Sequence, residues 1–310
     1  MGILVIGAVF VDIKGYPLEQ YIPGGRNVGR VIQVHGGVSR NVVEDIANVE
    51  LRPTYLSVVD HSGISDDVIN KLRRHKVNTD YIIRKKNGLG TWLAVFDHTG
   101  DVIASISSRP ELDAIAEVLD EKGDEIFSSC DSVVVEIDME RFLLNRIFSL
   151  ARKHGKEVYG VVSNMSLALE RRDMITQCGC FVCNEQEASM LFSVDCLDAT
   201  PEEMQEMLVK QVRAAMIPKM VVTMGASGAV YASMDGDSGI VPPQRVDVKD
   251  TTGAGDSFFA GIAIGLTYGK TLEESCVIGT RLASAVIAST ENVIPRFKPS
   301  EFGIEFESEF

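Results

Sequence analysis

The sequence predicts an α/β fold with three layers, in which helices cover both faces of a mostly parallel β-sheet. Short runs of β-branched residues alternate with longer stretches of helical periodicity, and this alternation is typical of βαβ units. The 310 residues, 45% of them apolar and 24% charged, are enough to bury the core of one large domain. Residues 13–35 and 80–107 break the alternation and predict a small β-strand lid. We therefore expect a single domain over residues 1–310.

The expected strands of the main sheet are short apolar runs bounded by turn residues. They are residues 4–10, 55–59, 132–137, 157–162, 179–183 and 220–224. Apolar residues at helical spacing predict helices between them, at residues 66–75, 140–154 and 201–216. Such apolar stripes are much more often core than function.

The two exceptional segments have the composition of antiparallel strands. Residues 13–35 are rich in glycine and valine and contain the pair Gly24-Gly25. Residues 91–97 and 101–107 flank His98-Thr99-Gly100, which predicts a β-hairpin. Together these strands are expected to project from the main sheet as a lid.

The charge balance limits the partners of the protein. With 30 Lys and Arg against 44 Asp and Glu, the formal net charge is −14. This charge repels nucleic-acid backbones and anionic lipid, so we expect no nucleic-acid or membrane partner. The sequence shows neither a run of 18 apolar residues nor a charged leader, which favours a cytoplasmic protein.

The six cysteines are expected to be reduced, because disulfides are rare in the cytosol. Cys178, Cys180 and Cys183 lie close enough in sequence to suggest a metal site. Only Cys180 and Cys183 have the Cys-x-x-Cys spacing of zinc ligands, and the run Cys-Phe-Val-Cys is typical of a buried strand. The core interpretation is favoured, and the role of these cysteines stays open.

The most informative stretch of the sequence runs from Asp250 to Gly261, ahead of an apolar helix. Small residues before a helix let its free N–H groups face an anion, so Gly253, Ala254 and Gly255 predict an anion hole. Asp256 follows in the first helical turn, where a carboxylate can accept a proton from a hydroxyl that attacks a phosphoryl group. The alternative is that Asp256 only caps the helix.

This stretch resembles the C-terminal signature of the ribokinase (PfkB) family of carbohydrate kinases, Asp-Thr-x-Gly-Ala-Gly-Asp. In that family the last Asp is the catalytic base, which corresponds to Asp256 here. Four other family marks occur in the family's order, and together they cover nearly the whole chain: Asp12, Gly36-Gly37 with Asn41, Asn184 with Glu187, and Thr223 with Gly225 and Gly228. The resemblance implies a ribokinase-like three-layer α/β/α fold, and ATP and Mg²⁺ as cofactors.

The acceptor side of the expected site lies in the N-terminal part of the chain. Gly36 and Gly37 lack a Cβ and allow a ligand to approach the backbone closely. Asn41, one turn into the following helix, can offer a donor and an acceptor to ribose hydroxyls. Asp12 would add a carboxylate to the same hydroxyls. The alternatives are a simple turn at the two glycines and a strand-end cap at Asp12.

The nucleotide side is expected at the carboxyl ends of two strands, where open α/β sheets bind ligands. Asn184 and Glu187 follow one strand, and the Glu187 carboxylate could hold Mg²⁺ through water. The alternative is an ordinary helix start, with Asn184 as the cap. Thr223 ends another strand, and by family analogy Gly225, Ser227 and Gly228 lie along ATP.

The family often has a monovalent-cation site near the anion-hole loop. Asp250 and Thr252 match its first ligands, and the later ones would come from residues 289–295. A K⁺ requirement is therefore a further hypothesis.

The acceptor is expected to contain ribose. Ribokinases usually carry Lys after the glycine pair, where this chain has Val38. The form Gly-Gly-Val-x-Arg-Asn looks most like that of pseudouridine kinases. This resemblance implies phosphorylation of pseudouridine at its 5′-hydroxyl. Thr91 and Trp92 on the lid are candidates for contact with the acceptor, Trp92 either by stacking on a base or as lid packing.

Several alternatives stay open. Ribokinase, fructokinase or adenosine-kinase-like activity would use the same residues. A non-catalytic nucleoside- or sugar-binding regulator is disfavoured, because a pure binder needs no base at Asp256. Lid edges often pair between subunits in this family, so a homodimer is expected.

Overall fold

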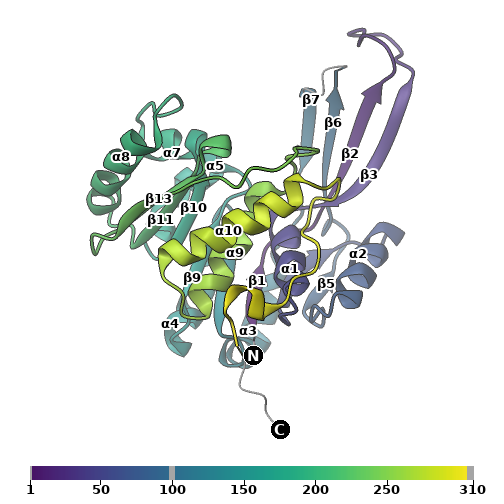
Figure 1. Cartoon of the computed structure of the whole chain (residues 1–310). Coiled ribbons are helices and arrows are strands. Elements are labelled where there is room, and N and C mark those ends of the chain that lie inside the picture. Colours follow the sequence, from purple (N-terminus) through teal and green to yellow (C-terminus); the bar gives the residue numbers. More distant parts are fainter. Residues whose placement is uncertain (1, 98–101, 306–310) are drawn as a thin grey trace.

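The computed structural model describes residues 2–97 and 102–305, which form two sheets (Figure 1). The main sheet has nine strands within these residues. In sheet order they are β13 (Ser238–Val241), β12 (Ala229–Ser233), β11 (Lys219–Thr223), β10 (Cys180–Asn184), β9 (Val158–Val161), β8 (Ser132–Glu136), β1 (Ile3–Ile6), β4 (Thr54–Val59) and β5 (Ile82–Arg84). The pairs from β11 across to β5 are parallel. The pairs β11–β12 and β12–β13 are antiparallel, so β12 runs opposite to the other described strands of this sheet.

Helices cover both faces of the main sheet, which confirms the three-layer prediction. One face packs against α1 (Val38–Asn48), α2 (Gly63–Arg74), α9 (Ala254–Thr267) and α10 (Leu272–Ile287). The other packs against α3 (Ala114–Ser129), α4 (Arg141–His154), α7 (Glu185–Phe192) and α8 (Pro201–Ala214). Shorter elements complete the chain: α5 (Met165–Ala168), η1 (Leu169–Arg171), α6 (Arg172–Ile175), η2 (Gly225–Ser227) and η3 (Pro299–Phe302).

The second sheet is the lid, and it projects from one end of the layered domain (Figure 1). Its strands, in order, are β3 (Gly29–Gly36), β2 (Phe10–Pro17), β6 (Gly90–Phe96) and β7 (Val102–Ser108). The antiparallel pairing of β6 with β7 is the predicted hairpin, although its expected turn at residues 98–100 lies outside the described residues. The central pair, β2 with β6, is parallel, so the expectation of antiparallel strands was wrong there.

Two predicted boundaries were wrong for the same reason. The apolar run 4–10 is divided: β1 ends at Ile6, and Phe10 already belongs to the lid. Between them, Ala8 bonds to side chains instead of a strand, because its N–H donates to Glu136 Oε1 and its carbonyl accepts from Ser39 Oγ. Within 80–107, β5 pairs with β4 of the main sheet, not with the lid. An apolar run does not reveal which sheet it joins.

The cysteines belong to the core. All six are buried and free. Cys180 and Cys183, three residues apart in β10, pack on opposite sides of the sheet, as strand alternation requires. Cys178 precedes the strand and packs on the α3–α4 side. Among the described residues, no helix has the length and apolar character needed to cross a membrane.

Candidate active site

The predicted nucleotide residues line a cavity of about 940 Å³ at the carboxyl ends of β10 and β11. Asn184 and Thr223 are directly paired in the register of these two strands, which brings their side chains to one edge of the sheet. The residues predicted from sequence that line this cavity are Asn184, Thr223, Gly225, Gly228, Ala254 and Gly255. Ser227 lies in the adjoining 3₁₀ turn η2 but not on the cavity wall. The lining also includes Arg245, which sequence reasoning did not select.

The predicted anion hole is the N-terminus of α9. Gly253 is the N-cap residue with φ 84°, and a Cβ there would collide with the carbonyl oxygen of Asn292, so only glycine fits. The Ala254 N–H donates to Thr251 O at 3.2 Å, so this amide is already engaged. Gly255 faces the cavity, with open space where a side chain would be. The open part of the hole is therefore the Gly255 side of the turn.

Asp256 lies in the first turn of α9, as predicted, and is half-buried. Its Oδ2 accepts a hydrogen bond from Asn41 Nδ2 at 2.5 Å. Burial, reinforced by the charges of Asp12 and Glu187, raises the pKa of Asp256 to about 6, although the Asn41 hydrogen bond and Arg40 act in the opposite direction. A carboxylate with this pKa is ionised at neutral pH and remains an effective proton acceptor.

Arg40 fixes the side chain of Asn41 through a hydrogen bond. Arg40 was not selected from the sequence as a site residue. The fully buried Arg40 forms an ion pair with Glu44 at 2.6 Å, and Glu44 also pairs with Lys71 at 2.9 Å. Its Nη2 donates to the Asn41 side-chain oxygen and to the His35 carbonyl. Asn41 Oδ1 is thereby occupied, which leaves its amide group directed at Asp256.

The lid presents Asp12 and Trp92 on one face. The two residues are directly paired in the parallel register of β2 and β6, and paired residues share a face of a sheet. Thr91, the adjacent residue, therefore points to the opposite face, so the structure does not bring Thr91 together with Asp12. Trp92 packs edge-on against Phe96, which stacks on Tyr16, and these rings extend the same face along the lid.

The glycine pair has a role in packing. The Asp12 carboxylate occupies the space that a Cβ of Gly36 would need. Gly37 is the N-cap of α1 with φ 99° and touches the backbone of Ala8 and Phe10. The pair therefore brings Asp12 and the start of α1 together. Burial raises the pKa of Asp12, while Lys14 and Arg40 lower it.

Glu187 has the helix-start role considered from the sequence as the alternative to a Mg²⁺ site. Asn184 and Glu187 form a reciprocal capping box at the start of α7, in which Glu187 Oε2 accepts from the Asn184 N–H at 2.9 Å. Burial, and then the nearby Asp138 charge, raise the pKa of Glu187. A cation at this point would offset that concentration of negative charge, so Glu187 is suited to Mg²⁺ held through water.

Asp138 is a buried carboxylate beside the site that the sequence did not single out. Its Oδ2 pairs with Arg109, which follows lid strand β7, at 2.9 Å, and also accepts from Ser163 Oγ at 2.7 Å. This ion pair ties the end of the lid to the main sheet.

The loop before the anion hole is organised by Asp250, whose Oδ1 accepts from the Thr252 N–H at 2.8 Å. Burial raises the pKa of Asp250, but hydrogen bonds from Thr252 and the charge of Lys14 reverse the shift, and its pKa lies below the usual range. Because Asn292 lies against Gly253, the 289–295 segment does approach this loop, as expected from the sequence.

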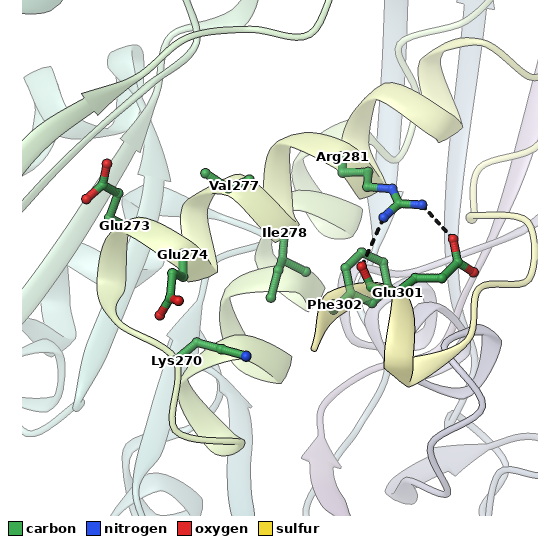
Figure 2. A pocket seen from close by; sticks show the side chains of 8 residues that line it. All are labelled: Lys270, Glu273, Glu274, Val277, Ile278, Arg281, Glu301 and Phe302. Carbon is green, nitrogen blue, oxygen red and sulfur yellow. Dashed lines mark hydrogen bonds and ion pairs between the residues drawn. The ribbon is translucent and has the colours of Figure 1, made fainter. Parts of the chain in front are cut away.

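A second cavity, of about 350 Å³, lies between α10 and the C-terminal η3 (Figure 2). Most of its charged groups have partners: Arg281 bonds to Glu301 at 2.6 Å, and Lys270 donates to Gly303 O at 2.9 Å. The Glu274 carboxylate is held in a capping box with Thr271. These contacts fasten the C-terminal segment onto α10.

One buried carboxyl near the site should make stability depend on pH. Burial, with the Asp138 charge, raises the pKa of Glu136 to about 7. The folded state then binds more protons than the unfolded state between about pH 4.5 and 7, so the free energy of unfolding falls as pH rises through this window. Glu136→Gln should reduce the fall between pH 5 and pH 8 by roughly 3 kcal/mol, measured by urea denaturation.

Glu121→Gln, at an exposed position on α3, is the control and should leave this pH dependence unchanged. An unaltered pH dependence in Glu136→Gln would show that Glu136 titrates in its ordinary range.

Comparisons with known proteins agree with this geometry. The family model described as "pfkB family carbohydrate kinase" matches residues 2–296. The chain is 33% identical to a guanosine-inosine kinase of Exiguobacterium acetylicum, over 94% of this chain and 95% of that protein. It is 24% identical to a pseudouridine kinase of Escherichia coli K12, over 88% and 86% respectively.

The fold is also that of solved kinases. Arabidopsis thaliana ribokinase, in a structure with ribose and ATP, superposes with a TM-score of 0.85 and 18% identity, over 99% of each chain. With the signature at Asp250–Asp256 and a family match that covers nearly all of its length, the chain belongs to the PfkB family of carbohydrate kinases, which are phosphotransferases with an alcohol acceptor.

Proposed function

We propose that the protein is an ATP-dependent kinase that phosphorylates the 5′-hydroxyl of a ribonucleoside, with guanosine and inosine as its acceptors. The observation that carries this proposal is the pairing of Trp92 with Asp12 on one face of the lid. Asp12 suits ribose hydroxyls, and a large aromatic ring beside it suits a base that continues from the ribose. A free sugar has no base on which that ring could stack. The name of the 33% identical relative supports a purine base.

In this proposal the residues around Asp256 carry out in-line transfer of the ATP γ-phosphoryl group. Asp256 takes the proton of the attacking 5′-hydroxyl, and Asn41 keeps the carboxylate aimed at it. The open amides at the start of α9 hold the charge that develops on the phosphoryl oxygens. Mg²⁺ bound beside Glu187 supplies charge neutralisation for the nucleotide phosphates. Asn184, Thr223, Gly225 and Gly228 position ATP, and the lid excludes water from the acceptor.

Pseudouridine is the second candidate acceptor. The sequence Gly-Gly-Val-Ser-Arg-Asn at residues 36–41 supports it, because Val38 replaces the lysine that is usual in ribokinases. The pseudouridine kinase of E. coli is a more distant relative than the guanosine-inosine kinase, so pseudouridine ranks second.

The test is ADP release from Mg-ATP with guanosine, inosine, pseudouridine, uridine, adenosine, ribose and fructose as acceptors, with and without K⁺. We expect turnover on guanosine and inosine. Trp92→Ala should raise the KM for the nucleoside by about tenfold or more, since stacking on one base is worth about 1–3 kcal/mol, and should leave the KM for ATP unchanged.

Phe142→Ala is the matched control, because it removes an exposed aromatic ring on α4, outside the lid. Turnover on ribose or fructose alone would replace the nucleoside proposal by a sugar kinase. Nucleoside binding without ADP release would instead support a regulator.

Two further parts of the proposal concern ions and assembly. We propose that Asp250 and Thr252, with carbonyl groups of residues 289–295, hold a K⁺ ion. Equal rates of ADP release in K⁺ and in a bulky organic cation would rule out this site.

We also propose a homodimer formed through the lid. Its support is the exposed apolar side chains on the lid face opposite Asp12, which include Val31, Leu93 and Ile106.

A further inference from the structure

Helix α1 carries three polar residues on one face, at a spacing that aligns them along the helix. Asn41, Asp45 and Asn48 are four and three residues apart, so their side chains lie above one another. Asn41 reaches Asp256 in α9, and Asn48 Nδ2 donates to the Ile294 carbonyl at 2.8 Å. Asp45, between them, is completely buried and has no role in the mechanism described above.

The Asp45 carboxyl group joins α1 to two segments that carry the active-site loop. Its Oδ2 accepts from Ser257 Oγ at 2.7 Å, and Ser257 directly follows Asp256. Its Oδ1 accepts from the Ile294 N–H at 2.8 Å. Both carboxyl oxygens are therefore used, one on each side of the anion hole.

The second of these segments closes the arrangement. Asn292, two residues before Ile294, has its carbonyl oxygen against Gly253, at the N-cap of α9. Its side-chain Nδ2 donates to the His35 carbonyl at 2.8 Å and to Asn41 Oδ1 at 3.3 Å. The contacts thus run from Asp45 through Ser257 to Asp256, and from Asp45 through Ile294 and Asn292 back to Gly253 and Asn41.

We propose that Asp45 is a positioning residue for phosphoryl transfer, holding Asp256 and the anion hole in register with Asn41 by its two hydrogen bonds. The inference rests on the proposed function, since it assigns Asp256 as the base. Asp45 itself does not touch either substrate. Its action requires hydrogen bonds on both oxygens and not a negative charge, so an amide of the same shape should replace it.

The surroundings of Asp45 favour the uncharged form. Burial raises the pKa of Asp45 well above its usual value, and the neighbouring charges of Asp256 and Glu44 act in the same direction, against the hydrogen bonds from Ser257 and Ile294. Charged groups that act on Asp256 include Arg40, Asp12 and Glu187.

The experiment compares Asp45→Ala with Asp45→Asn. Asp45→Ala removes both hydrogen bonds, so we expect kcat to fall at least tenfold while the KM for ATP stays within about twofold of the wild-type value. The acidic limb of the kcat/KM profile should move to higher pH, because the Asn41–Asp256 hydrogen bond loosens. Asp45→Asn keeps an acceptor for Ile294 and a partner for Ser257, and should restore kcat to within about threefold and the limb to its original pH. Ser257→Ala, which removes one hydroxyl, should change the same quantities less, and it replaces Asp45→Ala if that variant does not fold.

Ser132→Ala is the matched control, because it removes a buried hydroxyl that bonds to Thr267 at the other end of α9, at 2.6 Å. It should lower stability without moving kcat or the pH limb. Hydrogen exchange of amides 253–257 gives a readout that needs no acceptor: it should be faster in Asp45→Ala than in Ser132→Ala.

Two results would overturn the proposal. The first is a folded Asp45→Ala protein in which kcat, the pH of the acidic limb and the exchange of amides 253–257 are all those of the wild type. If Asp45→Ala does not fold, the same result in a folded Ser257→Ala protein would overturn the proposal. The second is an Asp45→Asn protein as impaired as Asp45→Ala. Failure of the proposed function is recognised separately, because the wild-type protein would then release no ADP with any acceptor, while the exchange experiment would still report on Asp45.

Discussion

Asp256→Asn should lower kcat with the preferred acceptor by about 10²- to 10⁴-fold, the range that a positioned general base contributes. The amide keeps the shape of the side chain but cannot take the hydroxyl proton. Asp256 is only half-buried and lies in the first turn of α9, whose residues from Ser257 to Gly265 are buried, so the fold should persist. The measurement is single-turnover phosphorylation, with ATP binding and thermal unfolding followed in parallel.

The wild-type pH profile checks the same assignment independently. Because the base must be ionised and its pKa is raised to about 6, kcat/KM should fall as pH drops through this value. Asp120→Asn, in an exposed ion pair with Arg146, is the control and should keep full activity. Near-full turnover by Asp256→Asn would remove Asp256 as the base.

Arg40→Met should destabilise the protein by about 3–5 kcal/mol, the usual cost of removing one partner of a buried ion pair. Arg40 and Glu44 are both fully buried, and the part-exposed Lys71 and His75 would remain beside the Glu44 carboxylate. The substitution also releases the Asn41 oxygen, so binding of the acceptor should weaken as well. Urea denaturation measures the first effect, and the KM for the nucleoside measures the second.

Arg146→Met is the matched control, because this arginine forms an exposed ion pair and such pairs contribute about 0–1 kcal/mol. The double variant Arg40→Met, Glu44→Leu should recover part of the lost stability by removing the buried carboxylate that has lost Arg40. A cost for Arg40→Met no larger than that for Arg146→Met would show that the buried pair is not important for the fold.

The parts of the site that were predictable from sequence are those encoded by local conformation. A run of small residues ahead of an apolar helix can form only a few structures, and the structure confirms that α9 starts at Ala254 with Asp256 in its first turn. The position of Asn41 one turn into α1 was predictable for the same reason. The alternation of strands and helices likewise predicted the three layers.

The remaining features depend on contacts between distant segments, which local patterns do not contain. A helix sequence with Arg40 and Asp45 looks like one with a charged surface, but both side chains are buried, Asp45 against α9 and the segment that contains Ile294. The alternation along β6 places Thr91 and Trp92 on opposite faces, but it does not say which of them faces the site. That follows from the register with β2, and hence from Asp12.

Because of the topology of the lid, the residues proposed to bind the acceptor and those proposed to bind the nucleotide lie in different parts of the sequence. The residues proposed for the acceptor, Asp12 to Trp92, lie in the first third of the chain, because both lid hairpins and α1 are formed there. The residues that line the nucleotide cavity all fall between Asn184 and Ile287. Substitutions that change the acceptor can therefore accumulate in one part of the coding sequence, while the protein encoded by the other part continues to bind the same phosphoryl donor. New acceptor specificities can then arise by recombination as well as by point mutation.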